Sequence, residues 1–186
     1  MLPHSFRATK EEFLDLPEKI YKVVNFELLP SQRLVYDRLK NEYAFLFENS
    51  DSDILEDVSF QAIAARTKMK QATSGFVNIY GEPVLMPDRE NPRMSAFKEV
   101  LESIMDTTPN RQFIVWAMFK EELKGIKATL DEMGITCEIY NGDTSKDERE
   151  RIIDEFQAGK IQGFIGDARA AGIGLTLTAA TLCNLL

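Results

Sequence analysis

The second half of the chain alternates short apolar runs with stretches in which apolar residues recur every three or four positions. Phe113–Ala117 is a continuous apolar run, typical of a strand covered on both faces of a parallel sheet. The apolar stripe that follows predicts a helix ending at Gly134: Phe119, Leu123, Ile126, Leu130 and Met133. Further strands are predicted at 135–140, 162–166 and 181–186. Strands and helices in this order predict a three-layer α/β sandwich with a parallel sheet.

The first half of the chain is predicted to be mainly helical. Residues 19–29 alternate loosely between apolar and polar positions, which suits a strand, and Pro30 ends it. Ser31 is then expected to cap a helix that runs to about residue 47. The acidic stretch 48–59 is interpreted as a solvated loop.

Another helix and a small hairpin follow the acidic stretch. Residues 60–75 have the alanine, methionine and glutamine content of a helix that ends at Gly75. A hairpin or irregular loop is predicted to turn at Tyr80–Gly81. Asn91–Pro92 then starts the next helix, because proline suits the first helical turn.

The change of pattern near residue 110 divides the chain into two predicted parts. Residues 1–110 form a mainly helical region that packs on the lobe, and residues 111–186 form the α/β lobe, incomplete at its C-terminus. Whether the first part is a distinct subdomain or wraps the second stays open. Its basic side chains suit either a solvated helix face or a phosphate-facing patch: Arg66, Lys68 and Lys70.

A turn and a helix cap are predicted after the second strand of the lobe. Asn141–Gly142 turns the chain. Ser145 and Glu148 have the spacing of a capping box, in which each side chain accepts a backbone amide at the start of the next helix.

Composition and charge narrow the class of protein. The hydrophobic share is 44% and the charged share 28%, values typical of a folded chain of 186 residues. The formal net charge of -8 repels a phosphate backbone at long range, so a nucleic-acid site would have to be a local patch. Neither a membrane-spanning run nor a signal peptide is visible, so we expect an intracellular protein, cytoplasmic or at the nucleoid or nucleus, with no membrane partner.

The sequence gives little evidence for a disulfide, a metal site or a hydrolytic active site. Cys137 and Cys183 lie in apolar stretches, which predicts buried reduced thiols, and His4 is the single histidine. The sequence contains no GxxxxGK[ST], HExxH or GxSxG motif. We therefore predict no metal site and no catalytic residue in this chain.

The loop after the third predicted strand of the lobe carries the richest candidate chemistry. Ligands bind beyond the carboxyl ends of parallel strands, and Asp167 and Arg169 stand just past such an end. Gly172, Gly174 and Thr176 follow, small residues that allow a phosphate to approach backbone amides or hydroxyls. A glycine pair after a strand is as often only a tight connection, so these residues alone leave both interpretations open.

Several segments, taken in order, carry a family resemblance. They are FIVWAMFKEEL, YNGDTSKDERERIIDEFQAG and GFIGDARAAGIGLTLTAAT, preceded by LPEKIYKVVNFELLPSQRLVYDRL, ARTKMKQATSGF and NPRMSAFKEVLESI. Together they resemble the C-terminal RecA-like lobe of Swi/Snf-type superfamily-two helicases and DNA translocases. The resemblance covers nearly the whole chain, and the order and spacing of the segments are its specific features.

The resemblance implies the second motor lobe of an ATP-dependent DNA translocase. Such a lobe closes on an N-terminal RecA-like lobe over ATP and Mg, which the N-terminal lobe mainly binds, and contacts double-stranded DNA. Carried over by position, the nucleic-acid contacts are Met118, Phe119, Lys120, Arg169, Gly174, Thr176 and Thr178. The nucleotide contacts are Asp167, Gly172 and Gly174. Arg149 matches an arginine of the family and is expected to be structural.

The sequence departs from the family in three places. Thr176 stands where the family usually has asparagine, and Ala171 where it often has a second glycine. The sequence also stops at Leu186, before the arginine-rich motif VI that would reach the ATP γ-phosphate. Without that motif and a P-loop, we expect the chain alone not to hydrolyse ATP.

Two other functions are weighed against the motor lobe. A free-standing Rossmann-like module that binds a nucleotide or a protein, without ATPase activity, is favoured by the acidic charge and the missing catalytic motifs. An α/β enzyme such as a sugar transferase is the weakest alternative, because no general base or DxD motif stands at a strand end.

Overall fold

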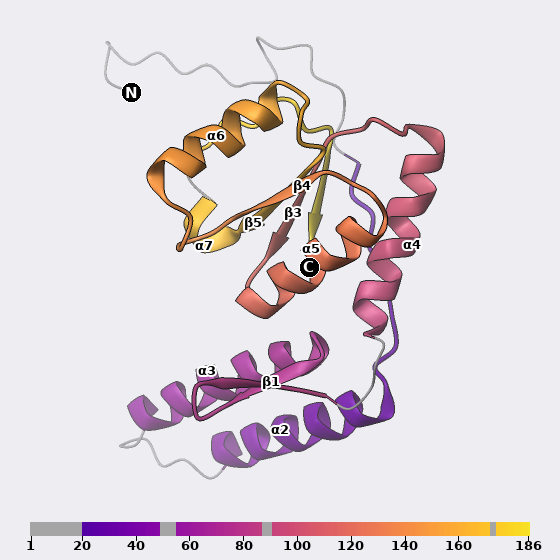
Figure 1. The fold of residues 1–186 in the computed structure, drawn as a ribbon. Helices are drawn as coiled ribbons and strands as arrows, with labels where there is room; N and C mark the ends of the chain where they lie inside the picture. Colours follow the sequence, from indigo (N-terminus) through magenta and orange to yellow (C-terminus); the bar gives the residue numbers. More distant parts are fainter. Residues whose placement is uncertain (1–19, 49–54, 87–90, 172–173) are drawn as a thin grey trace, which may run out of the picture.

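The computed structural model describes residues 20–48, 55–86, 91–171 and 174–186 (Figure 1). The elements of the N-terminal part are α2 (Pro30–Glu48), α3 (Leu55–Thr73), β1 (Phe76–Ile79), β2 (Glu82–Leu85) and α4 (Pro92–Thr107). Those of the lobe are β3 (Phe113–Ala117), α5 (Lys120–Glu132), β4 (Cys137–Tyr140), α6 (Lys146–Gln157), β5 (Gly163–Asp167), α7 (Ala168–Ala171) and β6 (Leu182–Leu185).

Four strands of the lobe form one parallel sheet in the order β4-β5-β3-β6. The apolar run of β3 lies inside the sheet, between β5 and β6, where both of its faces are covered. Phe113 pairs with Gly163 on one side and with Leu182 on the other, so the three strands begin level with one another. This arrangement confirms the predicted three-layer α/β fold with a helical region before it.

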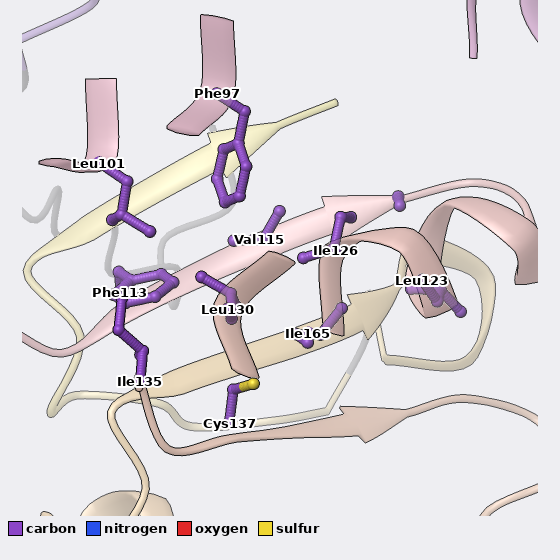
Figure 2. Packing of buried hydrophobic residues seen from close by; sticks show 11 residues of the cluster. Phe97, Leu101, Phe113, Val115, Leu123, Ile126, Leu130, Ile135, Cys137 and Ile165 are labelled. Carbon is purple, nitrogen blue, oxygen red and sulfur yellow. The ribbon is translucent and has the colours of Figure 1, made fainter. Parts of the chain in front are cut away.

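Side chains of β3 alternate between two hydrophobic clusters, one on each face of the sheet. Phe113, Val115 and Ala117 pack with α4 and α5, whereas Ile114 and Trp116 pack with α6. Figure 2 shows the first cluster, in which α5 lays its apolar stripe across β3 and β5. Full burial of side chains of this size stabilises the fold by roughly 1.5–3 kcal/mol each, so the two clusters dominate the stability of the lobe.

Helix α4 packs on the sheet although it precedes the predicted boundary at residue 110. Phe97 and Leu101 are buried in the same cluster as the α5 stripe (Figure 2). Asn91 caps the helix by accepting the Arg93 N–H at 3.0 Å, and Pro92 occupies the first turn, as predicted. The lobe is therefore covered on this face by two helices, one from each predicted part.

The remaining N-terminal elements lie below the lobe in Figure 1, where α2 and α3 run side by side. The predicted hairpin is confirmed, with Phe76 of β1 paired to Leu85 of β2. Tyr80 and Gly81 form its two-residue turn with φ values of 51° and 91°. Positive φ at both central positions matches the twist that a tight hairpin requires.

The predicted strand at 19–29 is wrong over the residues that the structure describes. Residues 20–29 contain no strand, and they run beside α4, whose Ala96 and Val100 line a common cavity with Ile20 and Phe26. Figure 1 shows this segment descending next to the helix. The apolar alternation is present, but a strand also needs a hydrogen-bonded neighbour, and these residues pair neither with α4 nor with the edge strand β6, whose Cys183 lines the same cavity.

Two helix starts also differ from the prediction. Helix α2 begins at Pro30, so Ser31 lies inside the first turn, and the Gln32 side chain accepts the Leu29 N–H at 3.1 Å. Helix α3 begins at Leu55, within the stretch interpreted as a loop. Most of the low-propensity Asn, Ser and Asp residues lie at the start of that stretch, and residues 55–59 contain neither glycine nor proline, so they can join the helix.

The predicted cap of α6 forms only in part. Ser145 Oγ accepts the Glu148 N–H at 3.3 Å, as expected for a capping box. The Glu148 carboxylate accepts from Arg151 at 3.3 Å, on the exposed side of the helix. The predicted turn at Asn141–Gly142 is present, and Asn141 Oδ1 accepts the Asp143 N–H at 2.9 Å.

The two cysteines differ in exposure. Cys137 is buried in the sheet cluster, as predicted, but Cys183 is exposed, so the prediction of a second buried thiol is wrong. Cys183 belongs to β6, which is an edge strand, and an edge strand lacks a neighbour on one side. His4 lies outside the described residues.

Candidate nucleic-acid interface

The loops after β3, β4 and β5 share one edge of the sheet. Ala117 at the end of β3 pairs with Asp167 at the end of β5, and Tyr140 of β4 pairs with Gly166. Because neighbouring parallel strands end together, the residues that follow them lie close to one another. We call residues 118–120, 141–145 and 167–169 the carboxyl edge.

The loop between β3 and α5 holds three of the residues predicted to contact DNA. Met118 is 37% exposed, and the Lys120 side chain is 64% exposed. The Phe119 ring instead packs edge-on against Phe76 of β1, with 5.6 Å between the ring centroids. Met118 and Lys120 thus present side chains to solvent, while Phe119 anchors the loop to the hairpin.

Lys120 also joins two loops of the carboxyl edge. Its Nζ lies 2.6 Å from Oδ2 of Asp143, in the loop after β4. Both side chains are largely exposed, and an exposed ion pair contributes little net stability. A phosphate could therefore replace Asp143 as the partner of Lys120 at small energetic cost.

Asp167 and Arg169 lie where β5 passes into the short helix α7. Asp167 Oδ1 accepts the Arg169 N–H at 2.9 Å, which fixes the start of that helix. The Arg169 side chain is exposed. Asp167, predicted to contact nucleotide, therefore has one carboxylate oxygen engaged, and Arg169 is exposed.

The segment after α7 is held by Gln157, the last residue of α6. Gln157 Nε2 donates to the Thr176 carbonyl at 2.9 Å and to Thr178 Oγ1 at 3.2 Å. Its Oε1 accepts the Ala179 N–H at 2.9 Å. Gly174 has a φ of 84°, a conformation that other residues rarely adopt. Gly172 lies outside the described residues.

The structure separates the predicted nucleic-acid residues into two groups. Leu182 pairs with Phe113, the first residue of β3, and the Thr181 N–H donates to the Gln112 carbonyl at 3.2 Å. The segment after α7 has therefore returned to the amino ends of the strands before β6 begins. Its two predicted threonines lie there, beside the end of α6, whereas Met118, Lys120 and Arg169 share the carboxyl edge.

Arg149 occupies the structural position that was expected for it. Its guanidinium donates to the carbonyls of Thr144 and Asn141, both at 2.9 Å, and of Gly142 at 3.3 Å. The same group lies over the Tyr140 ring, 5.2 Å from its centroid. Arg149 thus fixes the loop between β4 and α6, which includes the turn beside Asp143.

Two polar residues that organise these loops, Glu122 and Gln157, were not predicted from the sequence. Glu122 is buried and accepts the N–H groups of Met118 and Phe119, each at 3.0 Å. The sequence does offer one signal for Glu122. It stands three residues after Phe119, at the start of the predicted helix, and a glutamate at that position commonly accepts the free backbone amides at the helix start. Gln157 is the glutamine of the Phe-Gln pair in EFQAG, and its partners lie about twenty residues away in sequence, which spacing does not reveal.

The described residues contain neither a metal-binding group nor a membrane-spanning helix. These residues hold no group of three or more His, Cys, Asp or Glu side chains able to bind a metal ion. Among the same residues, no helix has the length and apolarity needed to cross a membrane.

Comparison with known proteins identifies the lobe. Residues 94–185 match the family model described as the helicase conserved C-terminal domain. An uncharacterised ATP-dependent helicase of Mycoplasma pneumoniae is 30% identical over 182 residues, which are 96% of this chain but 16% of that protein. The chain therefore spans about a sixth of that relative's length.

Two solved structures from Sulfolobus solfataricus share the fold. The SWI2/SNF2 ATPase C-terminal domain aligns with 86% of this chain and 75% of its own, at a TM-score of 0.65 and 19% identity. The SWI2/SNF2 ATPase core in complex with double-stranded DNA aligns with 96% of this chain and 43% of its own, at a TM-score of 0.66 and 18% identity. Residues 94–185 of the chain belong to the helicase C-terminal domain family, and the chain shares the fold of a SWI2/SNF2 ATPase C-terminal domain.

Proposed function

We propose that this chain is the second motor lobe of an ATP-dependent DNA translocase. In this proposal it contacts the backbone of double-stranded DNA, contributes part of the ATP interface, and acts only together with an N-terminal RecA-like lobe. The match to the helicase C-terminal domain supports the motor class. The similar Sulfolobus core, solved with double-stranded DNA, supports duplex DNA as the partner.

The observation that carries the DNA contact is the pair of exposed cations on the carboxyl edge. Lys120 and Arg169 follow the neighbouring strands β3 and β5, and the exposed Met118 lies on the same edge. In a chain of net charge -8, exposed cations on one edge offer direct partners for a phosphate backbone, and Lys120 can exchange its exposed ion pair with Asp143 for a phosphate. Thr176, Thr178 and Gly174 would contribute from the segment that Gln157 holds.

The described residues fit a secondary part of an ATP site. In this proposal the N-terminal lobe mainly holds Mg, as the family resemblance implies. Gly174 has open space where a side chain would stand, and one oxygen of Asp167 is not engaged in capping α7. Together with Gly172, these residues would let a nucleotide held by the partner lobe approach the backbone, and the ATP would supply the phosphoryl-transfer energy.

The test is salt-dependent binding of a fluorescent duplex DNA to the chain. Phosphate contacts release counterions, so the logarithm of the affinity should fall linearly with the logarithm of salt concentration. Lys120→Ala and Arg169→Ala should each weaken binding and lower the salt slope by about one. Lys98→Ala is the matched control, because Lys98 is an exposed cation on α4, paired with Glu102 at 3.9 Å and away from the carboxyl edge.

The same experiment distinguishes the proposed function from the alternative of a nucleotide- or protein-binding module. Such a module would show no salt-dependent affinity for duplex DNA. Equal affinities for wild type, Lys98→Ala and both edge variants would remove the carboxyl edge from the interface. An ATPase assay of the isolated chain, with and without DNA, is expected to show no turnover above buffer.

A further inference from the structure

A buried carboxylate, Glu122, sits at the base of the loop between β3 and α5. Its side chain is only 6% exposed. One oxygen, Oε2, accepts the N–H groups of Met118 and Phe119, each at 3.0 Å. The other oxygen accepts from Arg93 at 2.7 Å and from the hydroxyl of Ser74. Both carboxylate oxygens are thus engaged, one by the loop and the other by distant parts of the chain.

The partners on the far side come from the N-terminal helical region. Ser74 follows the last turn of α3, and Arg93 belongs to the first turn of α4. Arg93 also donates to Ser74 Oγ at 2.8 Å, and Asn91 Nδ2 donates to the Ser74 carbonyl at 2.7 Å. The end of α3, the start of α4 and the carboxylate therefore form one connected network.

This network and an aromatic contact hold the loop from the same direction. Phe119 packs edge-on against Phe76, which is nearly fully buried in β1, two residues after Ser74. A buried carboxylate is tolerated only when charge and hydrogen bonds compensate its lost hydration. Arg93 supplies the charge and the two loop amides supply hydrogen bonds, so the position of the loop and the position of the helical region depend on each other.

We propose that Glu122 is a positioning residue for the loop at Met118–Lys120, and that Arg93 and Ser74 act on this loop through it. The inference rests on the proposed function, in which the loop contacts DNA. The helical region thereby gains a specific role, because through Glu122 it fixes where Met118 and Lys120 stand on the carboxyl edge. Neither Arg93 nor Ser74 has a hydrogen bond to the loop itself within the described part of the chain.

The first test measures hydrogen exchange of the Met118 and Phe119 amides in the full chain. Glu122→Gln and Arg93→Met should each speed exchange of both amides by about tenfold or more, because a hydrogen bond to a well-held charged acceptor is lost. Glu121→Gln is the matched control, since it changes the neighbouring glutamate, which pairs with Lys124 on the exposed face at 2.7 Å. Its amide exchange at 118 and 119 should match wild type.

The second test measures duplex DNA affinity in the same variants at one salt concentration. Glu122→Gln and Arg93→Met should weaken binding by about threefold to tenfold, and Glu121→Gln should leave it unchanged. The double variant Glu122→Gln with Arg93→Met removes both charges, so no unpaired guanidinium remains buried. Its melting temperature should exceed that of Glu122→Gln, while its exchange at 118 and 119 stays fast and its DNA affinity stays low.

The outcomes separate this inference from the proposed function. The positioning role is overturned if wild type binds DNA but Arg93→Met has the same exchange rates at Met118 and Phe119, and the same DNA affinity, as Glu121→Gln. If the double variant regains wild-type exchange and affinity together with its melting temperature, Glu122 only stabilises the fold. If wild type binds no DNA, the proposed function fails, and the exchange measurement still decides whether Glu122 holds the loop.

Discussion

Gly166 is a position where an added methyl group would collide with a ring. A Cβ built there would overlap the indole of Trp116, lying 2.6 Å from Cε3, and would also stand 3.2 Å from Phe164. Trp116 and Phe164 pack edge-on with 6.1 Å between ring centroids, so neither ring can move away freely. The glycine is thus required by packing rather than by its backbone conformation.

Gly166→Ala is expected to lower the free energy of unfolding by about 1–3 kcal/mol, through overpacking of the cluster between the sheet and α6. Chemical denaturation followed by circular dichroism measures it. Gly125→Ala is the control, because a Cβ built there has no contact within 4 Å beyond its chain neighbours and the backbone of its own helix, and alanine suits a helix better than glycine. A Gly166→Ala variant as stable as wild type would show that the ring of Trp116 is not fixed as described.

Cys137 gives the lobe a specific dependence on alkaline pH. Burial raises the pKa of its thiol from the usual 9.0 to about 11. The folded chain keeps this proton over a range in which the unfolded chain releases it, so the unfolded state binds fewer protons there. The free energy of unfolding should therefore be unaffected by this group below pH 9 and should fall between pH 9 and about 11.

The measurement compares urea unfolding of wild type and Cys137→Ala at about pH 8 and about pH 10.5. Other groups titrate in both proteins, so the difference between them isolates the thiol. Wild type should lose more stability than Cys137→Ala between the two pH values. Equal losses would mean that the thiol is not buried in the folded state.

Among the secondary-structure elements, helix α6 shows how a sequence signature can be only half realised. Ser145 accepts the Glu148 N–H, whereas the Glu148 carboxylate is drawn to Arg151, which also bonds Glu155 at 2.6 Å. An i,i+3 and i,i+4 network on the exposed face competes with the return bond of the capping box. The start of the helix thus depends on the serine more than on the glutamate.

Ser145→Ala is expected to cost about 1 kcal/mol of stability, and Glu148→Ala about 0.5 kcal/mol or less, because only the serine satisfies a free backbone amide. Melting curves of the two variants show which substitution destabilises the protein more. The opposite order would show that the full capping box forms in solution.

Across the molecule as a whole, the candidate DNA contacts lie on opposite edges of the sheet. Arg169 follows the carboxyl end of β5, whereas Thr176 lies beside the end of α6, near the amino ends of the strands. Sites that share no contact partner usually contribute additively. This separation gives a quantitative expectation for the motor that contains this chain.

Arg169→Ala and Thr176→Ala should each lower DNA-stimulated ATPase of the complete motor by about threefold to tenfold, with melting temperatures unchanged. In the double variant the two losses, as free energies, should add within about 0.5 kcal/mol. Thr107→Ala, at the exposed end of α4, is the control. Unchanged ATPase in both single variants would remove both residues from the site, and strong non-additivity would mean that the two edges act on one contact.

Local patterns in the sequence were enough to place the four strands and the two longer helices of the lobe, because periodicity reports which face of a helix or strand is buried. The run Phe113–Ala117 and the stripe of α5 lie where the pattern placed them, as does the hairpin turn at Tyr80–Gly81. Order and spacing of the motifs also indicated the helicase family. The periodicity and turn signals are local in the chain, so residues close in sequence suffice to read them, whereas the family signal lies in the order of segments along nearly the whole chain.

Contacts between distant parts of the folded chain account for the features that the sequence did not predict. Residues 20–29 have the alternation of a strand but pair with no neighbouring strand, so no strand forms. Glu122 looks like one more surface glutamate until Ser74, 48 positions away, is brought beside it, and Gln157 acquires its role from Thr176 and Ala179. Hydrogen bonds and burial are properties of such pairs, and a pair distant in sequence exists only once the chain has folded.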